Sequence, residues 1–173
     1  MSPLVIFLAH RALLDQHTAL GEIHGWLRKQ GGCRDVRFEP SSIRRHEVAA
    51  TVDSTIFLGE PHPSETVGLR VAFEYPDDSA HEHYEIQWID SDRNYSFGWH
   101  QDDTHPDLGA CHFQLDYQDE TVVRNPAVFT NSHPLTVLEK RLAQVPLILE
   151  LLTWENGRPD LAQWPPQHRS SSG

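Results

Sequence analysis

Histidines and carboxylates concentrate between residues 83 and 117 of this 173-residue chain. Glu85, His100 and His112 fall at polar positions of alternating segments, and Asp102 and His105 lie in the stretch that joins the last two. An imidazole beside a carboxylate transfers protons near neutral pH, and three imidazoles with a carboxylate also suit a transition metal. These five are the candidate catalytic residues. The alternative is that a histidine-rich chain carries them on its surface without function.

Two strands and a tight turn must position the first of these side chains. Tyr84–Trp88 and Tyr95–Trp99 alternate apolar and polar residues, which is typical of half-buried strands, and turn residues separate them. A turn centred on Asp92-Arg93 places all the large rings on one face. The same register makes Glu85 and His100 neighbours on the other face, where the carboxylate should favour the protonated imidazole.

The remaining chain predicts one α+β domain over residues 1–153, followed by an extended or frayed tail over 154–173. Consecutive apolar segments, among them a β-branched run over Val48–Phe57, indicate an antiparallel meander, to which Thr121–Arg124 could add a short return strand. We expect a twisted sheet of about five strands with the N-terminal and C-terminal helices packed on one face.

The first helix should span roughly 3–30, although Leu4–Ala9 could instead form a strand. The second should open at His133-Pro134 and be kinked or split by Pro146.

Composition indicates an acidic protein of the cytoplasm. The net charge is −11, and Lys29 and Lys140 are the only lysines. This pattern is typical of a saline cytosol such as that of a halophilic archaeon, and a GC-rich genome explains it equally well. No apolar run approaches the roughly 20 residues of a membrane span, and no secretory signal is recognisable. Cys33 and Cys111 are expected to be free thiols.

The densest basic segment covers residues 33–47, and its interruption by Pro40-Ser41-Ser42 predicts a loop or a short edge element. Its four arginines could contact a phosphate backbone, or they could simply balance charge. Together with the outward Gln114, they are the candidate substrate-binding residues: Arg34, Arg37, Arg44 and Arg45.

Motifs for other chemistries are weak or absent. His81-Glu82-His83 has the H-x-H spacing of some metal sites, but it is too weak alone, and no metal ligand is assigned from it. The sequence has no G-x-S-x-G elbow, no Walker loop and no G-x-G-x-x-G, so it implies no nucleotide cofactor.

Residues 67–152, and above all the stretch YSFGWHQDDTHPDLGACHFQLDY followed by a helix that opens with His-Pro, resemble the TumE-like toxins of toxin–antitoxin pairs. The matching residues are Trp99, Asp102, His105, Pro106 and His112. The family's arginine–tryptophan–aspartate run is Gly98-Trp99-His100 here, and its second histidine after His112 is Gln114. The resemblance implies an antiparallel sheet with an aromatic hairpin, a toxin-like activity on RNA and an antitoxin-like protein partner.

Three functional hypotheses follow. The first is a toxin-like endoribonuclease, in which imidazoles take and give the protons of phosphodiester cleavage. The second is a non-catalytic interaction module or accessory subunit, since no catalytic motif is complete and Leu147–Leu152 is apolar on all sides. The third is a metal-binding domain built on the same histidines.

Overall fold

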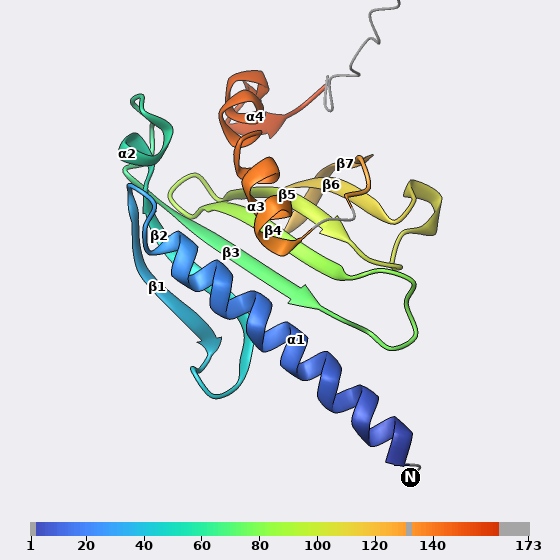
Figure 1. Ribbon diagram of the computed structural model, residues 1–173. Coiled ribbons are helices and arrows are strands. Elements are labelled where there is room, and N and C mark those ends of the chain that lie inside the picture. Colours follow the sequence, from blue (N-terminus) through green and yellow to red (C-terminus); the bar gives the residue numbers. More distant parts are fainter. Residues whose placement is uncertain (1–2, 131–132, 163–173) are drawn as a thin grey trace, which may run out of the picture.

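The computed structural model describes residues 3–130 and 133–162. A seven-stranded antiparallel sheet forms its centre, and each strand pairs with the next one along the chain (Figure 1). The strands are β1 (Cys33–Pro40), β2 (Arg45–Asp53), β3 (Thr66–Glu74), β4 (His83–Asp90), β5 (Tyr95–Gln101), β6 (Cys111–Tyr117) and β7 (Glu120–Pro126). A separate hairpin consists of β8 (Thr153–Glu155) and β9 (Arg158–Asp160).

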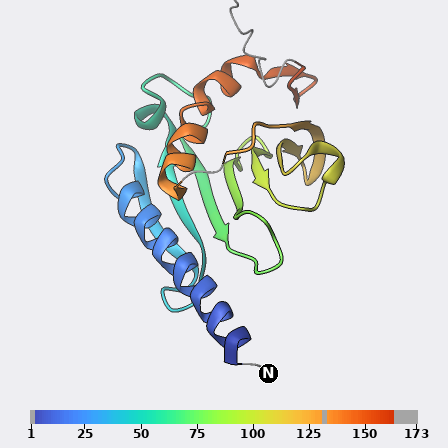
Figure 2. The same ribbon diagram turned by 45° about the vertical axis from the view of Figure 1, so that its right-hand side comes forward.

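The helices are α1 (Pro3–Leu27), α2 (Ser54–Leu58), α3 (Pro134–Leu142) and α4 (Val145–Leu151), and a 3-10 turn, η1, lies at Pro106–Leu108. The two views agree that α1 and α3 lie on the same side of the sheet (Figures 1 and 2). Helix α1 contacts β1, β2, β3 and α3. Within residues 3–130 and 133–162, no helix is long and apolar enough to cross a membrane.

The core lies between the helices and the alternate residues of the strands. Trp88, Trp99 and Phe113 are almost completely buried, and Leu20 of α1 and Leu138 of α3 pack into the same cluster. Burying a large apolar side chain contributes roughly 1.5–3 kcal/mol, so these rings fix which face of each strand points inward. The intervening polar residues must therefore occupy the opposite face, which we call the polar face.

The predicted hairpin register is confirmed. Ile86 pairs with Trp99 and Trp88 with Phe97, and the turn lies between Asp90 and Tyr95. Tertiary packing of the rings and the short turn specify the same alignment. The division of the C-terminal helix at Pro146 is also confirmed, because that proline occupies the first turn of α4.

The sheet has two more strands than the five predicted. Residues 33–40, expected to be a loop or a short edge element, form the full edge strand β1, and the short return expected at 121–124 extends to β7. Leu4–Ala9 is helical. The last part of the run Val48–Phe57 belongs to α2, because the Asp53 carboxylate accepts a hydrogen bond from the Ile56 amide and ends the strand.

The expected tail begins with regular structure. Residues 153–160 form the β8–β9 hairpin, and Leu161 is 2% exposed in the core. The rest of that prediction, from residue 163 onward, lies outside the described residues. Both cysteines are free, as expected.

Candidate functional site

Three imidazoles meet on the polar face, where β5 and β6 run side by side. His100 pairs with His112 in the ladder, and their rings stack with centroids 5.1 Å apart and planes 16° apart. The ring of His105 meets His112 edge to face at 4.9 Å. His112 is only 2% exposed, whereas the other two are partly exposed. Three of the predicted catalytic residues therefore form one cluster, with His112 at its centre.

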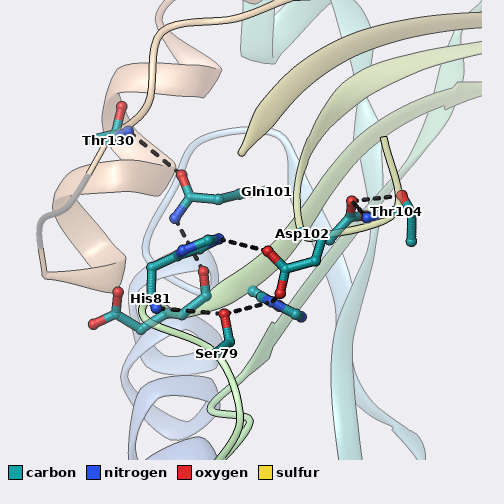
Figure 3. A network of polar contacts seen from close by, with 9 residues as sticks. Ser79, His81, Gln101, Asp102, Thr104 and Thr130 are labelled. Carbon is teal, nitrogen blue, oxygen red and sulfur yellow. Dashed lines mark hydrogen bonds and ion pairs between the residues drawn. The ribbon is translucent and has the colours of Figure 1, made fainter. Parts of the chain in front are cut away.

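The loop after β5 folds back over the polar face and delivers His105. The Asp102 amide donates a hydrogen bond to the Ala110 carbonyl at 3.0 Å, which closes the loop at its base. Within it, the amide and the hydroxyl of Thr104 both donate to Oδ1 of Asp102, at 2.9 and 2.6 Å. Figure 3 shows Thr104 beside Asp102. These bonds are a local Asx turn, and they fix the direction of the loop toward His112.

Burial governs the electrostatics of the cluster. Desolvation, followed by the nearby His100 imidazole, lowers the pKa of His112 to about 4, although the Asp102 carboxylate acts in the opposite direction. Desolvation opposes ionisation of Asp102, but the two Thr104 hydrogen bonds and the nearby His112 and His100 together lower the pKa of this carboxyl. At neutral pH the cluster therefore combines a neutral central imidazole with an ionised carboxylate.

The predicted ion pair between Glu85 and His100 does not form. The two residues are direct cross-strand neighbours, as the register requires. Within the part of the chain that the structure describes, however, Nε2 of His100 is buried without a hydrogen-bond partner, and no ion pair joins it to Glu85. The His100 ring stacks on His112 on the next strand instead.

The predicted substrate-binding arginines lie at the other edge of the sheet. Arg34 pairs with Asp53 at 3.0 Å and Arg37 with Glu39 at 2.7 Å. Arg45 stacks over Phe38 at 4.1 Å, and Arg44 lies in the connection between β1 and β2. Three strands separate β1 from β5 in the sheet order, so none of the four joins the histidine cluster. Substrate binding by these four residues stays a prediction, but the structure does not bring them to the histidine cluster, since proximity in sequence carries no information about the position of a strand in the sheet.

Gln114 does lie near the cluster, and it leads to an arginine that sequence reasoning missed. The side-chain amide of Gln114 donates to Asp116, and its oxygen accepts from Nε of Arg124 at 2.9 Å. The charge of Arg124 contributes to the lowered pKa of His112. The signal for Arg124 would have been its place opposite Gln114 in the β6–β7 ladder.

A second group lies at the start of β4 next to the same loop. His81 and His83 face Asp103, and their ligand atoms lie within 4.8 Å of one another. Next to this group lies a pocket of about 250 Å³, whose lining includes His83, Glu85, Asp102 and Thr104. Among the described residues, no other three His, Cys, Asp or Glu side chains converge in this way. The geometry therefore does not support a shared ion on His100, His105 and His112.

Comparisons with protein-family models, with curated proteins and with solved structures find no match for this chain.

Proposed function

We propose that this chain is a toxin-like protein that acts on RNA and cleaves phosphodiester bonds by acid–base catalysis. The observation that carries the proposal is the meeting of His100, His105 and His112 within stacking distance on the polar face. Two of these residues, together with the adjacent Asp102, are also residues that match the TumE-like toxins.

Exposure assigns the roles. His105 and His100 are partly exposed and would contact the RNA, one taking a proton from the 2′-hydroxyl and the other giving one to the leaving oxygen. His112 is too buried to touch a substrate and is a positioning residue. Because its pKa is about 4, it stays neutral and does not repel a protonated neighbour at neutral pH.

Phosphate binding requires positive charge, which an acidic chain must supply locally. Arg124 is the candidate, because it lies on β7 next to β6 and is held by Gln114. This assignment replaces the four arginines of residues 33–47.

A protein partner remains a prediction. The apolar run 147–152 supports it less than expected, because Ile148 is buried and Leu149 and Leu151 pack against the core.

The test is cleavage of a short RNA by untagged protein in the presence of EDTA. We expect wild-type protein to leave 2′,3′-cyclic phosphate ends, the product of attack by the 2′-hydroxyl. His105→Gln should cut at a rate lower by roughly 10²-fold or more. His46→Gln is the matched control, because His46 is an exposed histidine of β2. Absence of cleavage by the wild type at every salt concentration tried, with and without divalent metal, would rule out the proposal.

A further inference from the structure

The start of β4 and the end of β5 bring two histidines and one aspartate together. Tyr84 pairs with Gln101 at this end of the hairpin, so the residues just before and just after them face each other. His83 opens β4, His81 precedes it in the connection from β3, and Asp103 follows β5. Figure 3 shows His81 and Ser79 next to the loop that carries Asp102 and Thr104.

The donor atoms are arranged around one point. Nε2 of His83 lies 3.2 Å from Oδ2 of Asp103, and Nε2 of His81 lies 3.8 Å from Oδ1 of the same carboxylate. All three donor atoms lie within 4.8 Å of one another. Zinc bonds of about 2.0–2.2 Å place two ligands of a tetrahedral ion roughly 3.3 Å apart. Small side-chain rotations are therefore enough to close the set around an ion.

One of the three donor atoms is buried without a hydrogen-bond partner among the described residues, and a bound cation would explain its burial. This atom is Nε2 of His81. A buried polar atom without a partner is destabilising, and such atoms are rare in folded proteins. Phe129 contacts the His81 ring edge to face at 5.3 Å, and the side chain is 13% exposed. The ring is thus held with its free nitrogen toward Asp103, and a cation there would satisfy it.

The surroundings favour a cation and leave one side of the site open. The adjacent pocket is lined by three carboxylate residues, Glu74, Glu85 and Asp102, and by His83 itself. Three protein ligands with an open fourth position are the arrangement of catalytic zinc sites, and two histidines with one carboxylate also suit other divalent transition metals.

We infer that His81, His83 and Asp103 bind one divalent transition-metal ion, of which zinc is the best fit to the nitrogen and oxygen donors. This site is separate from the histidine cluster, and it does not depend on the proposed activity on RNA.

The experiment is titration of the untagged, metal-stripped full chain with Zn²⁺ by calorimetry, with the absorption of bound Co²⁺ as a second readout. We expect one ion per chain. His81→Gln/His83→Gln should bind at least tenfold more weakly, because only one ligand remains. Asp103→Asn should show the same loss. Its carboxylate is 64% exposed, so this variant is not expected to disturb folding.

Two controls make the result decisive. His46→Gln removes an exposed histidine that belongs to neither group, and His100→Gln/His105→Gln removes two imidazoles of the neighbouring cluster. Both should bind Zn²⁺ as the wild type does. The inference is overturned if the wild type takes up no metal, if Asp103→Asn binds as tightly as the wild type, or if the affinity falls in the His100/His105 variant instead. None of these outcomes depends on RNA cleavage, so the two proposals fail separately.

Discussion

His100 and His112 are direct partners in the β5–β6 ladder, and their imidazole rings lie nearly parallel, with centroids 5.1 Å apart. Nε2 of His100 and Nδ1 of His112 are both buried without a hydrogen-bond partner among the described residues. A proton on the His112 ring would place a charge in a desolvated site beside a second imidazole. Burial therefore favours the neutral form of His112, and stability should depend on pH.

The first prediction concerns that dependence. The pKa of His112 is about 4 in the folded chain, below the ordinary value of 6.5, so the unfolded chain binds a proton first as the pH falls. The free energy of unfolding should then decrease between about pH 6.5 and 4, by at most about 1.4 kcal/mol per pH unit from this residue. His112→Phe should reduce the slope in this window, as measured by urea unfolding. An unchanged slope would contradict the assignment to His112.

The second prediction concerns Gly98, which lies on β5 between the two aromatic positions Phe97 and Trp99. A Cβ at residue 98 would lie 2.0 Å from the backbone oxygen of Ile86 on the paired strand, so β4 and β5 would have to separate. Gly98→Ala should lower the free energy of unfolding by about 2 kcal/mol or more. Thermal unfolding measures the loss.

Gly68 on β3 is the matched control. A Cβ at this position would meet only Ile89, at an ordinary contact distance of 3.5 Å. Gly68→Ala should therefore leave the melting temperature unchanged or raise it slightly, because alanine restricts the unfolded chain. Equal destabilisation by both substitutions would mean that the close approach at Gly98 has no special role.

The third prediction concerns Arg141 of α3, which is 4% exposed. Its guanidinium donates to the Tyr84 hydroxyl at 2.9 Å and to the Val128 carbonyl at 2.6 Å, and so connects the helix to β4 and to the segment that follows β7. Arg141→Met removes this donor from the buried Tyr84 hydroxyl and from the partly buried Val128 carbonyl. The free energy of unfolding should fall by roughly 2–4 kcal/mol in urea titrations.

Lys140→Met is the control for the loss of one positive charge, because Lys140 is exposed. This substitution should change the free energy of unfolding by less than about 0.5 kcal/mol.

The sequence predicted best where a local pattern and the packing agree. The alternation of large rings around Ser91–Asn94 leaves one register that buries Trp88 and Trp99 together, and the structure has that register. Strand β1 was left open between a loop and a short edge element because Cys33–Pro40 is mostly charged and partly exposed at the edge, so pairing with β2 rather than apolar alternation makes it a strand. Helix α2 carried readable signals, the N-cap Asp53 and the left-handed Gly59, but the β-branched residues before them favoured a strand.

The candidate site was predictable in part for the same reasons. His100 and His112 occupy polar positions of neighbouring strands, so their meeting follows from register. The direction of the His81 side chain does not follow from register, because His81 lies in an irregular connection. The position of the basic segment in the sheet does not follow from register either. Sheet order places residues 33–40 at one edge and β6 and β7 at the other, and a linear sequence without pairing information cannot give that order.

The last prediction uses that order to separate two arginines in RNA binding. Arg124 lies on β7 beside the histidine cluster, and Arg37 lies on β1, roughly 24 Å from β6 if five strand spacings of about 4.8 Å are added. Arg124→Gln should weaken binding of a short RNA and reduce the slope of log affinity against log salt by about one, as expected for the loss of one phosphate contact. Arg37→Gln changes the net charge equally but should leave affinity near that of the wild type, because the Arg37 guanidinium pairs with Glu39 at the far edge.

Fluorescence anisotropy at several salt concentrations measures both variants. If the two lose affinity equally, binding reflects overall charge and Arg124 is not part of the site; if only Arg37→Gln does, RNA binds along β1 and β2 instead.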